Sequence, residues 1–438
     1  MNKIQFGNTE SCALLNNKPI GLSCIIYIVF CIFYISGSNS ALHNYIQVGL
    51  FGIWCVSALL EDAHRFIGAI TNKTTVFLLL FLLYYFFTSI FEADIPYVLT
   101  YVVVFLMLYS CYIPYLYYRG RGRRSEVKFI TYASLMAWTF LSLSAIAFYQ
   151  INPSAARTLA ADFTAFDNLY IGGGYAIAIG SALLFVWLFS LLCKGYLNLN
   201  KLTKYFVLGF LILLFYLLIK TESTTTLLAC VIGSIFSLIE LLRSSKNIGI
   251  QFLLVIFLVF IAYFVISGGV SSFGTDLVAV TDYGADDNVL LRRFNRIGEK
   301  LMSAGTDSTT ENYVDERWGL VVMSWNKFLE YPIFGMGYTV GNIFSRLEES
   351  GLGTHSEICD MLAQHGIVGC FFFIMYLKNA LKCKGIRLAN NGFILTMLIM
   401  ALFNPFRYFH AFYVLLTLMP FVELLIKDKS LRTRNTRN

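Results

Sequence analysis

Long apolar runs constrain the fold of this chain more than any other feature of its sequence. About twelve segments are almost free of charge, and their lengths approach the ~20 residues that a helix needs to cross a bilayer. Hydrophobic residues make up 57% of the chain and charged residues 13%, whereas soluble domains are about a quarter charged. A β-barrel would alternate apolar and polar residues over roughly ten-residue segments, and these runs are continuous. The sequence therefore predicts an all-α polytopic membrane protein.

The predicted spans divide the chain into three parts. They are Ile20–Ser36, Tyr45–Leu60, Thr75–Phe91, Tyr97–Tyr117, Phe129–Tyr149, Leu169–Cys193, Tyr205–Ile219, Thr224–Leu242, Ile248–Ile266, Ile358–Leu377, Gly392–Phe406 and Ala411–Ile426. Residues 1–266 hold the first nine spans, and residues 267–357 form one large external loop. Residues 358–438 hold the last three spans and a basic tail.

The distribution of basic residues between the spans predicts the orientation. With the N-terminus in the cytoplasm, 23 of the 33 Lys and Arg residues fall on the cytoplasmic side. Cytoplasmic loops of membrane proteins carry an excess of Lys and Arg, so both termini are expected to be cytoplasmic. The run Arg119–Arg124 is then expected to contact anionic membrane lipids, and no nucleic-acid site is expected.

The external loop Ser267–Glu357 is predicted to be partly folded. Loops of this length are usually functional or disordered. Glu316–Glu330 is expected to form an amphipathic helix, with Asp315 as its N-cap and Pro332 beyond its end. One face of this helix would hold Trp318, Val321, Val322, Trp325, Phe328 and Leu329, and the other Arg317, Ser324 and Lys327. Such a helix either lies on the membrane surface or covers a cavity.

Thr354-His355-Ser356-Glu357 precedes the next apolar helix with the spacing of a capping box. In this interpretation Thr354 is the cap and Glu357 reaches back to it. His355 would lie in the first helical turn, where the helix dipole disfavours an imidazolium. A neutral imidazole in that place can accept a proton near pH 7. The structural alternative is an ordinary histidine at the membrane interface.

Cationic residues on the external side form the second chemical signal. They are Arg157, Lys220, Arg292, Arg293, Arg296, Arg317, Arg346 and Arg407. A guanidinium binds phosphate through two parallel hydrogen bonds, and charges this close to a bilayer are candidates for function. Solvated surface arginines and an interfacial Lys220–Glu222 pair are the structural alternatives. From Ser267 to Asp360 there are 7 basic and 14 acidic residues, so these cations would bind an anion only as a local cluster.

The motifs of the loop occur in a recognisable order. Arg317-Trp318, Tyr331-Pro332, Gly335-Met336-Gly337, His355-Ser356-Glu357 and Gly366-Ile367-Val368-Gly369 follow one another. This pattern resembles the O-antigen polymerase (Wzy) and O-antigen ligase superfamily of bacterial inner-membrane glycosyltransferases. The resemblance implies a GT-C-like fold, a periplasmic loop, and transfer of a glycan from an undecaprenyl-diphosphate donor to a sugar hydroxyl, without metal or cofactor. It also implies a chain-length regulator as a possible partner.

The resemblance assigns roles to particular residues. It implies that Arg317 contacts the diphosphate or the glycan, and that His355 is the base or orients the acceptor. Family members often carry a Ser-Arg pair where this chain has Lys220-Thr221-Glu222-Ser223-Thr224. Lys220, Arg157 and Arg293 are therefore candidates for the second cation, although an ammonium is not a guanidinium fork. The expected substrate contacts are completed by Arg292, Glu357 and Arg407.

The resemblance leaves the reaction open between two transferases. The polymerase extends a lipid-linked chain with repeat units, and the ligase moves a finished chain to the lipid A core. We favour the polymerase, and the ligase is the first alternative. A flippase for lipid-linked oligosaccharides is the alternative from another class, although the chain lacks the internal repeats typical of transporters.

Overall fold

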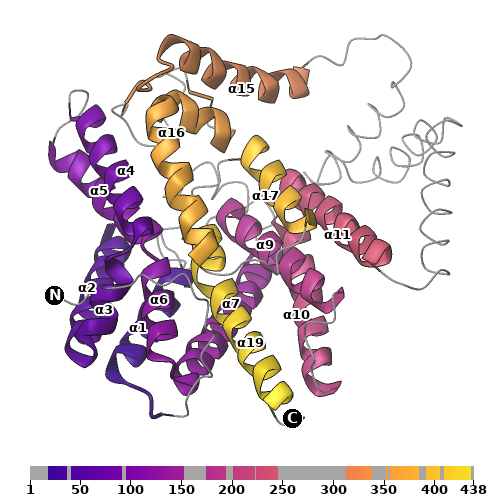
Figure 1. Cartoon of the computed structure of the whole chain (residues 1–438). Helices are drawn as coiled ribbons and strands as arrows, with labels where there is room; N and C mark the ends of the chain where they lie inside the picture. The colour runs from indigo at the N-terminus through magenta and orange to yellow at the C-terminus, as the bar shows by residue number, and fades with distance from the viewer. Residues whose placement is uncertain are drawn as a thin grey trace, which may run out of the picture.

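The structure is a computed structural model that describes residues 18–36, 41–90, 95–151, 174–193, 201–221, 223–244, 312–337, 352–353, 356–383, 391–404 and 409–435. The helices are α1 (Leu22–Ser36), α2 (Ala41–Glu61), α3 (Ala63–Ile70), α4 (Lys73–Ser89), α5 (Ile95–Tyr109), α6 (Tyr112–Arg121), α7 (Arg124–Ile151), α9 (Gly174–Cys193), α10 (Lys201–Lys220), α11 (Thr224–Ser244), α15 (Asn312–Glu330), α16 (Glu357–Cys383), α17 (Asn391–Phe403), α18 (Phe409–Tyr413), the π-helix η2 (Val414–Leu418) and α19 (Met419–Asn435) (Figure 1). Within these ranges no strand occurs.

The predicted all-α architecture is confirmed. Every predicted span except Ile248–Ile266 coincides with a helix or helix group, and Ile248–Ile266 lies outside the described residues. Within the described residues, Arg124–Gln150 and Glu357–Leu381 are long and apolar enough to cross a membrane. Ala63–Ile70 and Lys73–Ser89 would make a third span if the pair, bent by 56°, crosses as one. Seven shorter apolar helices accompany them.

The joint between the second and third predicted spans contains a short helix, α3, that the sequence did not predict. Local capping explains why α3 and α4 are separate helices. Asp62 caps α3 by accepting the amide of Arg65 at 3.1 Å, and Asn72 caps α4 by accepting the amide of Thr75 at 3.1 Å. Each side chain satisfies a backbone donor at a helix start, so the chain bends between α3 and α4.

Prolines explain two interruptions in helices that the sequence predicted as continuous. The segment Tyr97–Tyr117 is divided into α5 and α6, which separate around Ser110. Pro114 lacks the N–H that would bond to the Ser110 carbonyl, and its ring would clash with that oxygen. The Ser110 carbonyl instead accepts the amide of Ile113 at 2.8 Å. The π-helix η2 ends two residues before Pro420, within the last apolar segment, and Pro420 lacks the N–H of a regular helical bond.

The interior of the bundle is aromatic, and much of its exterior is aliphatic. Trp54, Trp138 and Trp187 are fully buried, together with Tyr27, Tyr34, Tyr109, Tyr112, Tyr117, Tyr118, Tyr149, Tyr376 and Tyr413. Several tyrosines find a partner inside: the Tyr376 hydroxyl donates to the Tyr109 carbonyl at 2.6 Å. Large apolar side chains, such as Leu83 and Ile374, point outward instead. A surface of this kind suits a lipid solvent better than water.

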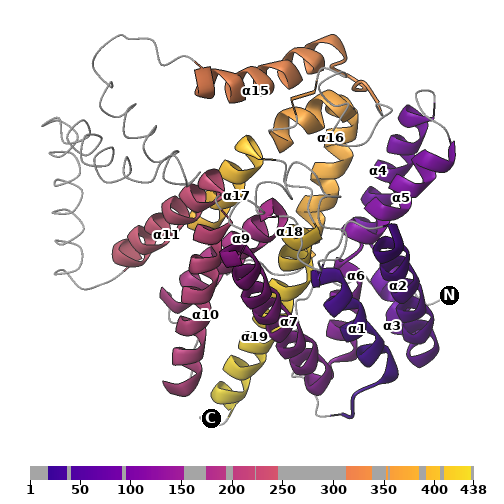
Figure 2. The ribbon, with the colours of Figure 1, turned by 180° about the vertical axis from the view of Figure 1, so that it is seen from behind.

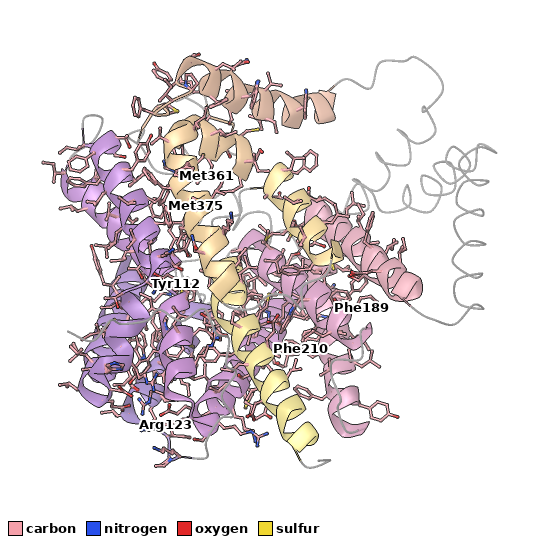
Figure 3. The ribbon with its side chains drawn as sticks, in the orientation of Figure 1. Tyr112, Arg123, Phe189, Phe210, Met361 and Met375 are labelled. Atoms are coloured by element: carbon pink, nitrogen blue, oxygen red, sulfur yellow. The ribbon has the colours of Figure 1, made fainter. Side chains whose placement is uncertain are left out.

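The helices pack into two groups that meet where α7 contacts α10. α1 packs against α2 and α7, while α11 packs against α9 and α17. α16 lies along α4 and carries α15 across one end, as both views show (Figures 1 and 2). The C-terminus lies at the opposite end from α15. Arg123 and Met361, labelled in Figure 3, mark these two ends.

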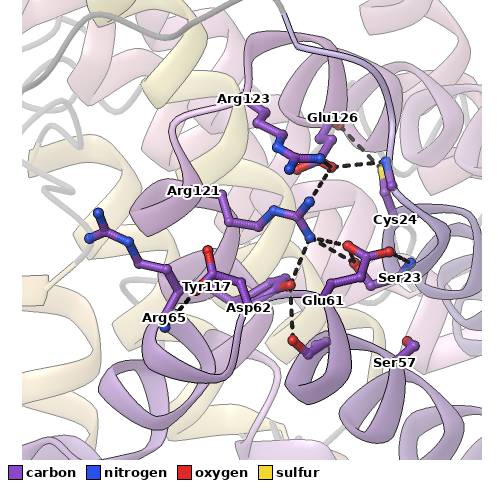
Figure 4. Close-up of polar contacts among 12 residues, drawn as sticks. Ser23, Cys24, Ser57, Glu61, Asp62, Arg65, Tyr117, Arg121, Arg123 and Glu126 are labelled. Carbon is purple, nitrogen blue, oxygen red and sulfur yellow. Dashed lines mark hydrogen bonds and ion pairs between the residues drawn. The ribbon is translucent and has the colours of Figure 1, made fainter.

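A buried ionic cluster holds together the end of the bundle that is remote from α15 (Figure 4). We call Ser23, Glu61, Tyr117, Arg121, Arg123 and Glu126 the Arg121 cluster. Arg121 pairs with Glu61 and, at 3.1 Å, with Glu126, and its guanidinium also donates to the Tyr117 hydroxyl at 2.7 Å. Arg123 reaches Glu126 at 3.2 Å. The side chains of Arg121 and Glu126 are 2% and 0% exposed.

The Arg121 cluster gathers joints that the charge pattern places on one side of the membrane. The amide of Ser23, at the start of α1, donates to Glu61 at the end of α2. Arg124, at the start of α7, pairs at 3.0 Å with Asp428 of α19. Burial alone would lower the pKa of Arg121, but the carboxylates of Glu61 and Glu126 outweigh it and raise this pKa above its ordinary value. The cluster is therefore charge-balanced within itself.

Candidate functional site

The candidate site lies where α15, the loop after it and α16 meet. The loop Tyr331–Gly337 runs beside a break in α16, and backbone hydrogen bonds join the two. Met336 and Gly337 donate to the carbonyls of Ala363 and Gln364 at 2.9 and 3.2 Å. Ile367 and Val368 donate to Pro332 and Ile333 at 2.9 and 3.1 Å. The four amides fix the loop on α16 independently of any side chain.

Two glycines permit this close approach. Gly366 interrupts α16 with φ 58° and ψ −170°, a backbone region that is essentially restricted to glycine. Gly335 has φ 69°. A Cβ at Gly335 would lie 2.3 Å from the Gln364 carbonyl oxygen, and one at Gly366 would lie 2.4 Å from the Ile333 carbonyl oxygen. The Gly-x-Gly and Gly-x-x-Gly motifs of the sequence thus form the two sides of one backbone contact. We call this contact between Gly335 and Gly366 the glycine contact.

Residues of α4 support the break in α16 from below. The Tyr84 hydroxyl donates to the carbonyl of His365 at 2.8 Å and also lies against the carbonyl of Phe334. The His365 ring is buried and makes edge contacts with Phe81 and Tyr85, with ring centroids 5.2 and 5.7 Å away. None of these residues belongs to a recognisable sequence motif, since Tyr84 and His365 lie 281 positions apart.

A second connection runs from α15 to the start of α16 through one carboxylate. The Ser324 hydroxyl donates to Asp360 Oδ1 at 2.5 Å, and the Ser356 amide donates to Asp360 Oδ2 at 3.3 Å. The Gly353 amide in turn donates to the Ser324 hydroxyl oxygen at 2.9 Å. We call Ser324, Gly353, Ser356 and Asp360 the Asp360 cluster, and all four residues are buried. The cluster fixes the chain directly before and directly after Thr354 and His355.

The predicted capping box is wrong in register. α16 begins at Glu357, and its cap is Ser356, whose hydroxyl oxygen accepts the amide of Cys359 at 3.3 Å. Asp360 replaces Glu357 as the side chain that reaches back to the cap. A serine cap with a carboxylate one turn later satisfies the equivalent donors two residues further along the chain. The Glu357 amide donates to the Asn404 carbonyl at 3.3 Å, which places the end of α17 beside the start of α16.

The predicted helix is confirmed, and residues from both of its predicted faces are buried. α15 ends at Glu330 before Pro332, as predicted, and begins at Asn312, so Asp315 is not its N-cap. Val321 and Ser324 are buried against α16. Trp318, Trp325 and Leu329, also predicted on the apolar face, are exposed. Ser324, predicted on the polar face, is buried because its hydroxyl donates to Asp360.

The structure describes only part of the predicted site. His355, Arg157, Arg292, Arg293 and Arg407 lie outside the described residues. Arg317 is in the second turn of α15, seven residues before Ser324. Lys220 ends α10, where its ammonium lies 5.6 Å from the ring centroid of Tyr216. Cation–π contact and the helix C-terminus both suit a lysine there, so its position has a structural explanation.

Described residues near Arg317, His355 and Arg407 nevertheless show that the three segments carrying these residues are close together. α15, which carries Arg317, is bonded through Ser324 to the Asp360 cluster that brackets His355. Asn404, three residues before Arg407, accepts the Glu357 amide. Among the described residues, no three His, Cys, Asp or Glu side chains are grouped as they would be around a metal ion.

Comparison with known families identifies this region. Residues 209–374 match the model of the O-antigen ligase family, Wzy_C. This segment resembles a domain of the O-antigen ligase family. It runs from α10 to the middle of α16 and therefore contains α15, the glycine contact and the Asp360 cluster. The predicted resemblance to the Wzy and O-antigen ligase superfamily is confirmed. Among curated proteins no match is found.

Proposed function

We propose that this protein is a polymerase of O-antigen or of a related surface polysaccharide. It would transfer a glycan from undecaprenyl diphosphate to a sugar hydroxyl of another lipid-linked repeat unit. The O-antigen ligase family domain supports this class of reaction. In this proposal the chain has about twelve spans and a GT-C-like fold in the bacterial inner membrane. Both termini are cytoplasmic, and the site faces the periplasm.

The observation that carries the site assignment is the Asp360 cluster. It binds Gly353 to Ser324 of α15 and Ser356 to Asp360 of α16, and these two residues lie on either side of Thr354-His355. Seven residues are close to two helical turns, so position 317 lies on the same side of α15 as Ser324. The two residues proposed for catalysis, Arg317 and His355, therefore belong to segments that the described contacts join.

The proposed step is a displacement at the anomeric carbon of the donor glycan. The acceptor hydroxyl oxygen forms the new glycosidic bond, and the bond to the diphosphate breaks. His355 accepts the hydroxyl proton, and the diphosphate leaves with the electron pair. Arg317 would stabilise the charge that develops on the diphosphate, assisted by Lys220, Arg157, Arg292, Arg293 or Arg407. Glu357 would contact the glycan. The reaction would use no metal or cofactor, and a chain-length regulator is a proposed partner.

Variants in a polymerase-null host test the proposal. His355→Ala and Arg317→Ala should accumulate glycolipid with a single repeat, while wild type produces long-chain ladders. His64→Ala and Arg65→Ala are matched controls, because both residues are exposed on α3. Equal amounts of inserted protein must be compared. Normal ladders from both site variants would exclude this assignment.

The ligase is the second candidate, because the matching family model is named for it. It would attach finished polymer to the lipid A core and would complement a ligase-null host. Restored chain length in a polymerase-null host, without complementation of the ligase-null host, would exclude it. Transport of the lipid-linked glycan across liposomes without a new glycosidic bond would instead indicate a flippase.

A further inference from the structure

α15 exposes a straight line of large apolar side chains. Trp318, Trp325 and Leu329 are 58%, 44% and 58% exposed. Their spacings of seven and four residues place them on one side of the helix. We call these three residues the tryptophan stripe. Val321 and Ser324 are buried against α16, so the stripe is not the face that packs on the protein.

The tryptophan stripe continues into a lipid-type surface. Ile333 and Phe334 follow α15 and are also exposed. The amide of Ile367 bonds to Pro332, and Ile367 begins an exposed row on α16. That row contains Ile367, Phe371 and Ile374, on one face of the candidate span Glu357–Leu381. Exposed apolar side chains thus occur on α15, on the loop that follows it and on a helix that can cross the membrane.

We propose that α15 lies in the interfacial layer of the membrane, with the tryptophan stripe inserted among the lipid headgroups. Trp is enriched at this depth, because its ring is apolar and its N–H reaches water. α15 crosses the end of α16 and does not extend it (Figures 1 and 2). Lys327 and Glu330 form an ion pair at 2.7 Å away from the stripe, so α15 also has a polar side.

The depth of the tryptophan stripe would also affect the binding of the lipid-linked donor, an inference that rests on the proposed function. Trp318 directly follows Arg317 in α15. A helix held at headgroup depth keeps position 317 level with the lipid phosphates. The diphosphate of a lipid-linked glycan lies at the same depth, because its polyprenyl chain is in the bilayer. The stripe would therefore set the height at which the donor diphosphate meets α15.

Quenching of native tryptophan fluorescence tests the inference directly. The full-length protein is placed in phosphatidylcholine vesicles whose acyl chains carry bromine at shallow or deep positions. Trp54, Trp138 and Trp187 are fully buried, so quenching should come from Trp318 and Trp325. Shallow bromines should quench more than deep ones, and the Trp318→Phe/Trp325→Phe variant should lose at least half of the quenching. Equal quenching of wild type and variant would overturn the inference.

A functional comparison uses neighbouring positions on α15. Trp325→Glu should raise the KM for the lipid-linked donor about tenfold, while Asn326→Glu adds the same charge at an exposed position off the stripe. Equal effects of the two changes would contradict an insertion role. Inactivity of wild-type protein would exclude the proposed function, and the quenching result would still decide the membrane contact. A change of tryptophan emission on addition of a soluble glycan, without quenching by brominated lipid, would contradict the inference and indicate that the stripe binds sugar.

Discussion

The two polar clusters at opposite ends of the molecule are built from different interactions. The Arg121 cluster consists of guanidinium–carboxylate pairs, in which Arg121 and Arg123 are matched by Glu61 and Glu126. The Asp360 cluster uses a hydroxyl, two amides and one carboxylate. The first neutralises its own cations, so it suits a structural joint. The described contacts of the second come from a hydroxyl and two backbone amides, so they suit the positioning of a chain segment.

This difference predicts that substitutions in the two clusters have different effects. The largest expected effect is a loss of folding stability when the Arg121 cluster is disrupted. Arg121→Ala leaves the fully buried Glu126 carboxylate without its main partner, and breaking a buried pair typically costs about 3–5 kcal/mol. We expect most of the protein to aggregate after extraction in detergent, measured by size-exclusion chromatography. The molecules that remain folded should show wild-type activity.

The control for this variant is Arg65→Ala at the same end of the bundle. Arg65 is exposed, and its amide, not its side chain, bonds to Asp62. Wild-type yield is expected for it. A folded Arg121→Ala protein with selectively lost transferase activity would show that the Arg121 cluster belongs to the catalytic machinery.

The glycine contact beside the Asp360 cluster predicts the next largest effect. Gly366→Ala forces a side chain into a glycine-only conformation, which costs about 1–3 kcal/mol before any clash is counted. The new methyl group would also collide with the Ile333 carbonyl. We expect loss of polymer ladders together with a lower melting temperature. Gly209→Ala, in α10 of the same domain, has open space around its Cβ and should change neither.

The sequence predicted the helices far better than the contacts between them. Apolar periodicity located α15, and long apolar runs located most of the other helices, because each pattern depends on neighbouring residues. The break at Ser110 and the short helix α3 were missed, because local proline and cap chemistry outweighs the apolar pattern there. The order of motifs located the site region. The bond from Ser324 to Asp360 joins residues 36 positions apart, and no spacing rule encodes which face of α15 turns inward.

A smaller effect, on catalysis, is expected from the Asp360 cluster itself. Asp360→Asn removes the charge that binds Ser324 and the Ser356 amide, at a typical cost of about 1–3 kcal/mol. We expect kcat to fall about tenfold with little change in the KM for donor, because the chain around His355 loses its fixed position. Ser324→Ala should act similarly, and the two changes together should be less than additive.

A double variant distinguishes positioning from a general structural role. If Asp360 acts through His355, adding Asp360→Asn to His355→Ala should lower the residual rate no further. A multiplicative loss, or a melting temperature that falls as far as that of Arg121→Ala, would contradict the proposed division between the two ends.

The smallest predicted effect concerns the pH dependence of the Arg121 cluster. Burial alone would raise the pKa of Glu61, but hydrogen bonds from Arg121 and Ser23 outweigh it, and the pKa is lowered. A carboxyl with a lowered pKa in the folded state adds stability above its unfolded pKa of about 4.3 and loses it as the pH falls. The difference in melting temperature between wild type and Glu61→Gln should therefore be present at pH 7 and shrink below about pH 4.3. Glu330→Gln, at the other end, removes a surface pair worth about 0–1 kcal/mol and should show almost no difference at either pH. A constant difference for Glu61→Gln across this range would mean that its carboxyl contributes through shape and hydrogen bonding, not through charge.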